Sequence, residues 1–127
     1  MEKIKYKKIK QGKYKYELTE SYSIQTEILK ACHIAKYIYL TATGSLLICK
    51  KYRWDGCSGP TIDDPTNQRA GLVHDSIYQL MAEGLLSDGW RAYADRLFFK
   101  ILREDGMPYW RAQYYWLGVR LAGWKFV

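Results

Sequence analysis

The sequence predicts an α+β fold: a small N-terminal antiparallel sheet, then a Gly/Pro-rich loop, then three helices. Apolar and polar residues alternate with a period near two in the first half, which is typical of strands. After Pro65 the apolar residues recur at steps of three and four, which is typical of helices. A chain of 127 residues has the length of one domain. We expect a basic arm (1–12), the sheet (13–54), the loop (55–65) and the helices (66–127).

Strands are expected at two places in the first half. Between residues 13 and 29, rings and aliphatic side chains alternate with polar ones, which favours strands buried on one face. A second strand pair, 37–40 and 46–52, flanks Thr43-Gly44-Ser45, where glycine permits a tight hairpin turn. The apolar positions of the first stretch are Tyr14, Tyr16, Leu18, Tyr22 and Ile24.

Two amphipathic helices are expected after the loop. Thr66 or Asn67 caps the first, and Ser87 or Asp88 caps the second. The turn between them, near 84–88, is short, so the two helices should pack antiparallel. Their apolar stripes are Ala70, Val73, Ile77, Leu80 and Met81 in the first helix, and Ala94, Leu97, Phe98, Ile101 and Leu102 in the second.

A third helix is expected at the C-terminal end. Gly106 ends the second helix, and Pro108 suits the first turn of the next because its missing N–H has no helical partner there. This helix is rich in Tyr, Trp and Arg and runs to about Gly123.

Positive charge is concentrated in the N-terminal arm. The chain has 20 Lys and Arg against 13 Asp and Glu, a net charge of +7, and seven lysines but one glutamate fall within the first 16 residues. Such an arm either attracts nucleic acid, an anionic membrane or an acidic partner, or is a solvated tail or strand edge. Nucleic acid is the least favoured partner, because no recognition motif accompanies the charge. The 20 aromatic residues favour half-buried surfaces that meet a ligand, partner or lipid interface.

The cysteines and the hydropathy exclude several classes of protein. Cys32, Cys49 and Cys57 are an odd count without a CxxC pair, which excludes a disulfide framework and a cysteine-rich zinc site. We expect three buried thiols in reducing surroundings. No stretch approaches the ~20 apolar residues of a membrane span, and the lysine-rich start lacks the apolar core of a signal peptide. We therefore expect a soluble protein without a signal peptide or transmembrane segment.

Four polar residues form a candidate catalytic site. A spacing of four places His74 and Tyr78 on one face of the first helix, with Asp75 one position round. Asp95 lies 21 residues after His74 and can face it across the antiparallel helix pair. A carboxylate that accepts a hydrogen bond from one imidazole nitrogen fixes the tautomer and leaves the other nitrogen as a general base. The alternative is a structural hydrogen bond between two helices.

A cation site is expected beside His74. Asp75 is aimed toward the loop at 56–59 and can share a Ca²⁺ ion with backbone carbonyls, since calcium prefers oxygen ligands. The alternative is that Asp75 only caps a helix or pairs with Arg69 or Arg91.

The run from Gly56 to Phe98 resembles the catalytic helix pair of the phospholipase A2 superfamily. The shared features are the glycine loop, Pro65, Ala70, His74-Asp75-x-x-Tyr78, Gly84 and Ala94-Asp95-x-x-Phe98. The resemblance implies that His74 activates water, that Asp95 is its partner and that Tyr78 supports the pair. It also implies a Ca²⁺ site made by Asp75 and the loop carbonyls near Gly56, Ser58 and Gly59. The carboxylate of Asp55 and the side chain of Arg91 are further candidates at this site.

A larger part of the chain, about residues 14 to 124, is similar to the DUF1353 family of phages and prophages. The similarity lies in the order of a sheet, Trp54-Asp55-Gly56-Cys57-Ser58-Gly59-Pro60, His-Asp-x-x-Tyr, Arg91-x-x-Ala94-Asp95-x-x-Phe98 and an aromatic helix with Arg120 and Gly123. It implies a phage or prophage protein that acts in the host cytoplasm or belongs to the virion.

Two functional hypotheses follow. The first is a phage-encoded, Ca²⁺-dependent hydrolase of lipid esters that meets a phospholipid or membrane interface. The second is a non-catalytic virion, tail-associated or host-factor-binding protein in which His74, Asp75 and Asp95 are structural. A His-Asp metal phosphohydrolase is disfavoured, because it needs further histidine ligands and only His33 is present. The oligomeric state is left open.

Overall fold

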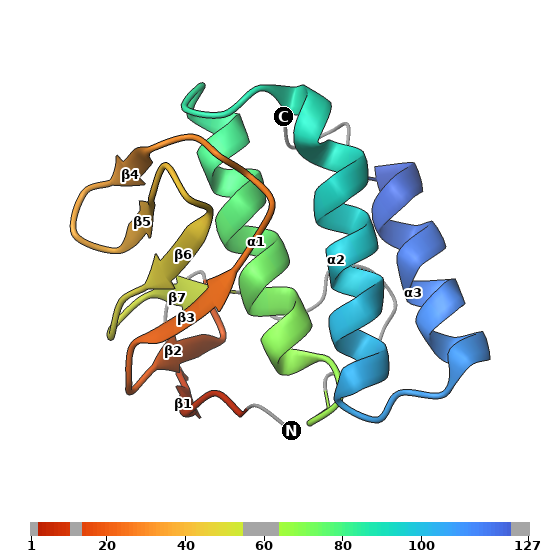
Figure 1. Cartoon of the computed structure of the whole chain (residues 1–127). Coiled ribbons are helices and arrows are strands. Elements are labelled where there is room, and N and C mark those ends of the chain that lie inside the picture. Colours follow the sequence, from red (N-terminus) through yellow and green to blue (C-terminus); the bar gives the residue numbers. More distant parts are fainter. Residues whose placement is uncertain (1–2, 11–13, 55–63, 123–127) are drawn as a thin grey trace.

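The computed structural model describes residues 3–10, 14–54 and 64–122. Strands make up one side of the molecule, and the three long helices lie side by side (Figure 1). The first long helix stands between the strands and the second, and the third packs on the far side of the second. The architecture is α+β with an antiparallel helix pair, as the sequence predicts.

The strands form two antiparallel sheets, whereas the sequence predicted one. The smaller sheet has the order β1-β2-β7, and the larger has the order β3-β6-β5-β4. The strands divide because β2 pairs with β7 far along the chain, while β3 pairs with β6. The bounds are β1 Tyr6–Lys8, β2 Tyr16–Leu18, β3 Tyr22–Gln25, β4 Cys32–Ile34, β5 Ile38–Leu40, β6 Ser45–Ile48 and β7 Arg53–Trp54.

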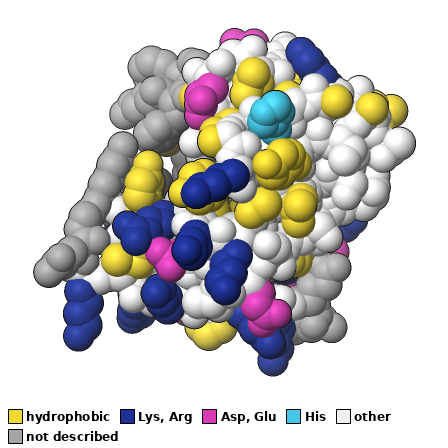
Figure 2. Space-filling model, turned by 90° about the vertical axis from the view of Figure 1, so that its left-hand side faces the viewer, with side chains coloured by type: hydrophobic (Ala, Val, Ile, Leu, Met, Phe, Trp, Pro, Cys, Tyr) yellow, Lys and Arg dark blue, Asp and Glu magenta, His cyan; other side chains and the backbone are white. Residues whose placement is uncertain are grey.

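Part of the basic arm is the edge strand β1 of the smaller sheet. Lys5 pairs with Glu20 at 2.8 Å, and Lys7 pairs with Glu17 at 3.4 Å. Lys and Arg side chains gather over the strand-bearing side of the molecule (Figure 2). The charge of the arm therefore belongs to a basic surface on that side.

The predicted hairpin connects β5 and β6, and Gly44 is required in it. Gly44 has a φ of +92°, and a Cβ at this position would collide with the carbonyl oxygen of Thr26. The second strand of the hairpin ends at Ile48, earlier than predicted, and Lys51 adopts a positive φ of 81° beyond it. Cys32 and Cys49 are free thiols that are half-buried, where buried thiols were expected, and Cys57 lies outside the described residues.

The helices are α1 Gln68–Ala82, α2 Arg91–Glu104 and α3 Tyr109–Ala122. Gly84 and Gly106 follow α1 and α2 with φ of +76° and +102°, a conformation that favours glycine at helix ends. Ser87 caps a short 3₁₀ turn, η1 Asp88–Trp90, that precedes α2. Asn67 occupies the N-cap of α1 without a side-chain cap; its Oδ1 accepts a hydrogen bond from the Asp64 amide instead.

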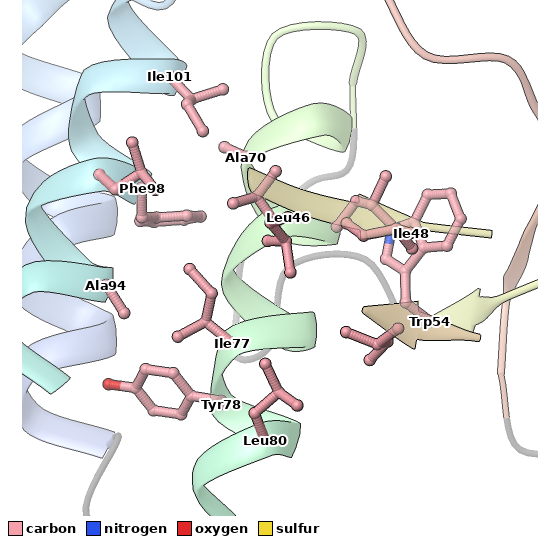
Figure 3. Close-up of a cluster of buried hydrophobic side chains, with 14 of the residues drawn as sticks. Leu46, Ile48, Trp54, Ala70, Ile77, Tyr78, Leu80, Ala94, Phe98 and Ile101 are labelled. Atoms are coloured by element: carbon pink, nitrogen blue, oxygen red, sulfur yellow. The ribbon is translucent and has the colours of Figure 1, made fainter. Parts of the chain in front are cut away.

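The main core lies between the strands and the first two helices. Figure 3 shows Leu46, Ile48 and Trp54 from the strands facing the side chains of α1, with Phe98 of α2 on the other side. Every residue of the two predicted apolar stripes is buried. No helix in the described part of the chain is long and apolar enough to cross a membrane.

Arg69 fastens the start of α1 to the end of α2 and to β3. Its guanidinium is almost completely buried and bonds both carboxylate oxygens of Asp105, at 3.1 and 3.0 Å. It also donates to Glu104 Oε1 at 2.7 Å and to the Tyr22 hydroxyl at 2.9 Å. These contacts of Arg69 fix the relative position of α1 and α2, the helices on which His74 and Asp95 lie.

Candidate functional site

The site is centred on the carboxylate of Asp95, which is completely buried on α2. Its Oδ1 lies 2.6 Å from His74 Nε2 and accepts a hydrogen bond of 2.7 Å from the Tyr78 hydroxyl. Its Oδ2 accepts a hydrogen bond of 2.8 Å from Arg120 Nη1. Side chains from all three long helices therefore meet at one carboxylate.

The helix pair positions His74 against Asp95. The short turn at Gly84 makes α1 and α2 antiparallel neighbours, so that residues 21 apart along the chain face each other. Tyr78, one helical turn further along α1, packs against His74 with ring centroids 4.1 Å apart and ring planes tilted by 32°. Phe98 of α2 covers another part of the imidazole, with centroids 5.0 Å apart. The imidazole is thus held between two rings as well as by its hydrogen bond.

The carboxylate of Asp95 is held in its ionised form. Burial alone would raise the pKa of Asp95, but the hydrogen bonds from His74, Tyr78 and Arg120 outweigh burial and hold this pKa below its usual value. Burial and the hydrogen bond to Asp95 raise the pKa of Tyr78 to about 12. Near neutral pH, Asp95 is therefore an anion and Tyr78 a neutral donor.

This charge state determines the tautomer of His74. An ionised carboxylate has no proton to donate, so the imidazole must donate from Nε2. In neutral His74, the lone pair is consequently on Nδ1. The His74 side chain is 9% exposed, while Asp95 is inaccessible. The arrangement is that of a general base whose orientation and tautomer are set by a buried anion.

Two arginines border the Tyr78–Asp95 pair. Arg91, at the start of α2, partly opposes the rise of the Tyr78 pKa. Its Nη2 also lies 3.4 Å from the Arg120 carbonyl oxygen. Arg120 was not among the predicted site residues. Its one signal in the sequence is its place in the order of motifs that carries the DUF1353 resemblance.

The structure describes only part of the expected calcium site. Asp75 is half-buried on α1, next to His74. The predicted loop ligands Gly56, Ser58 and Gly59, together with Asp55, lie outside the described residues. Within residues 3–10, 14–54 and 64–122, no group of three or more His, Cys, Asp or Glu side chains could hold a metal ion. The described residues do not form a metal site by themselves.

The family model described as "Protein of unknown function (DUF1353)" matches residues 34–119, which is more than half of the chain. The match contains His74, Asp75, Tyr78 and Asp95, and it ends one residue before Arg120. No curated protein and no solved structure matches the chain.

Proposed function

The chain belongs to the DUF1353 family, and from that premise we propose that it is a hydrolase in which His74 is the general base. The family description names no activity, so the proposal depends on the site itself. The observation that carries it is the 2.6 Å contact between His74 Nε2 and the buried, ionised Asp95. This contact leaves Nδ1 of His74 as the proton acceptor.

The reaction is hydrolysis of an ester by general-base catalysis. Nδ1 of His74 accepts a proton from water as the water oxygen attacks the carbonyl carbon. When the tetrahedral intermediate collapses, the carbon–oxygen bond to the alcohol breaks, and the imidazolium returns the proton to the leaving alkoxide. Asp95 stabilises the imidazolium, and Tyr78 and Arg120 keep Asp95 in position. Proton transfer of this kind contributes about 10²- to 10⁴-fold to the rate.

Lipid esters are the proposed substrates, and a phage or prophage is the proposed source. The lipid assignment is supported by the resemblance of His74-Asp75-x-x-Tyr78 and Asp95 to the phospholipase A2 helix pair, and the phage setting by the resemblance to DUF1353. On the basis of the phospholipase resemblance, we also propose that Asp75 is a calcium ligand. Calcium supplies a Lewis acid to such a reaction when it is bound.

Hydrolysis assays on the purified full chain test the proposal. Phospholipid vesicles and short-chain soluble esters are incubated with the wild type, with and without CaCl₂. His74→Ala should lose at least about 100-fold in turnover while the circular dichroism spectrum stays that of the folded protein. His33→Ala is the matched control, because His33 is the other histidine of the chain and lies exposed on β4. Turnover that survives in His74→Ala, or no turnover of any ester by the wild type, contradicts the proposal.

One observation favours a second, non-catalytic function. His74 is more than nine-tenths buried, and both oxygens of Asp95 are occupied by donors from α1 and α3, as in a purely structural clamp. In this case the protein acts by binding a virion or host protein. No ester would be hydrolysed, and His74→Ala would lower the free energy of unfolding without affecting any turnover.

A further inference from the structure

The outer face of α3 exposes large apolar side chains. Five of them are each between 49% and 72% exposed, although the opposite side of the helix is packed on α2 through Ala112 and Tyr115. Clusters of large, exposed apolar side chains mark interaction sites in many proteins. The five residues are Tyr109, Trp110, Tyr114, Leu117 and Leu121, which we call the α3 face.

The α3 face is uncharged in a chain of net charge +7. The two charged residues of α3, Arg111 and Arg120, flank the face and form ion pairs with Asp64 at 2.7 Å and Asp95 at 2.8 Å. Two copies of a strongly basic chain repel each other over most of their surfaces. The five side chains of the α3 face carry no charge themselves, although Arg103 of α2 lies over the ring of Tyr109 at its edge, 5.8 Å from the centroid.

Gly118 lies inside this helix, and the described residues give no packing reason for a glycine there. Glycine weakens a helix interior relative to alanine. A Cβ at Gly118 would meet nothing within 4 Å, so close packing in the described fold does not require glycine there. A glycine on an exposed helix face does allow a second helix to approach closely.

The side chains along α3 are graded in size. Trp110, Tyr114, Gly118 and Ala122 follow one another at steps of four and form one ridge of the helix: two large rings and then two small residues. In an antiparallel pair related by a twofold axis, Trp110 of one copy lies opposite Ala122 of the other, and Tyr114 lies opposite Gly118. The ridge is therefore complementary to itself.

We propose that the α3 face binds a second copy of this chain, with the two α3 helices antiparallel about a twofold axis. A lipid surface is the other candidate. Binding to lipid, however, does not require the gradient from large to small side chains along α3 or a glycine at position 118. Helices that lie on membranes also carry Lys and Arg on their polar face, whereas both arginines of α3 are in ion pairs within the chain.

The size of the α3 face determines the strength of this dimer. Aromatic side chains bury about 150–250 Å² each, so the face offers roughly 500 Å² per copy and about 1,000 Å² in the pair. This area lies at the lower limit of specific interfaces. The dimer is consequently weak and depends on protein concentration.

Sedimentation velocity of the full chain, over the micromolar to millimolar range, tests the proposal. The wild type should shift from monomer to dimer with concentration. Leu117→Glu, which places a charge in the centre of the α3 face, should lower the association constant at least about tenfold. Leu29→Glu is the matched control, because Leu29 is also an exposed leucine but lies outside α3, and it should associate like the wild type.

Gly118→Leu separates loss of association from loss of folding. Leucine fills the space that the partner's Tyr114 needs, so the association constant should also fall at least about tenfold. The same change should raise the melting temperature of the monomer, because leucine favours the helix and its Cβ would meet nothing within 4 Å in the described fold. A wild type that stays monomeric throughout contradicts the proposal, as does equal association of the wild type, Leu117→Glu and Gly118→Leu. If a monomeric wild type binds zwitterionic vesicles through Leu117, the face binds lipid and the dimer is wrong.

Discussion

Arg120 Nη1 donates a hydrogen bond of 2.8 Å to Oδ2 of Asp95. The contact brings α3 to the carboxylate that is hydrogen-bonded to His74. With Oδ2 occupied by a cation, Oδ1 is left to His74 and Tyr78, and the buried charge of Asp95 is compensated. The third helix is therefore part of the site and not only a cover for α2.

Arg120→Gln is expected to destabilise the protein. A hydrogen bond between charged groups contributes about 1.5–3 kcal/mol, and the partial exposure of Arg120 places the expected loss near 2 kcal/mol. Urea unfolding measures it as a lower midpoint at constant slope. Arg96→Gln, an exposed arginine next to Asp95 on α2, is the control and should change stability by less than about 0.5 kcal/mol. Equal losses in the two variants would show that the contact with Asp95 is not stabilising.

Tyr78→Phe is expected to change how stability depends on alkaline pH. Because the pKa of Tyr78 is raised to about 12 from 10, the folded protein favours the neutral phenol. The raised pKa of Tyr78 therefore contributes to the free energy of unfolding. The contribution, roughly 2 to 3 kcal/mol, is complete below about pH 10 and is lost as the pH rises through about 12. The gap in stability between the wild type and Tyr78→Phe, measured by urea unfolding from pH 9 upward, should shrink over that interval. A gap that does not change with pH would contradict the buried hydrogen bond to Asp95.

Arg69→Met should strongly lower the free energy of unfolding, because it removes the guanidinium that pairs with the buried carboxylate of Asp105. Removing one partner of a buried ion pair costs about 3–5 kcal/mol. Arg69→Lys should restore only part of the loss, since one ammonium cannot make the paired hydrogen bonds of the guanidinium. Thermal and urea unfolding measure both changes. If Arg69→Lys is as stable as the wild type, the paired hydrogen bonds to Asp105 are not what stabilises the helix pair.

Calcium binding is tested by thermal shift. If Asp75 is a ligand, CaCl₂ should raise the melting temperature of the wild type, by the equivalent of about 2.7 kcal/mol at a concentration 100 times Kd. Asp75→Asn should abolish the shift. Glu83→Gln, an exposed acid immediately after α1, should keep it. An equal shift in Asp75→Asn would place the ion elsewhere, and no shift in the wild type would remove calcium from the proposed reaction.

The helical half of the fold was predictable because its signals are local. The stripes through Ile77 and Phe98 identified the buried faces, and glycines 84 and 106 identified the helix ends. The short turn after Gly84 then favoured an antiparallel arrangement of α1 and α2. In that arrangement, the spacing of 21 residues allows His74 and Asp95 to face each other, as they do in the structure.

The features that were missed depend on long-range packing. The alternation of apolar and polar residues predicts strands but does not determine which strands pair. The pairing of Glu17 with Arg53, for example, joins distant parts of the chain. The contact of Arg120 with Asp95 depends on the rotation of α3 about its axis. Apolar residues such as Trp110 and Tyr115 lie on both sides of α3, so no single stripe predicts that rotation.

We expect Asp95 to hold His74 as the Nε2–H tautomer, with Nδ1 as the base. Two-bond ¹H–¹⁵N NMR spectra of the histidine side chains, recorded on the wild type and on Asp95→Asn, test it directly and need no substrate. The wild type should show a protonated Nε2 and an unprotonated Nδ1 for neutral His74, and Asp95→Asn should lose this preference. A His74 protonated on Nδ1, or the same spectrum in both proteins, would contradict this role of Asp95.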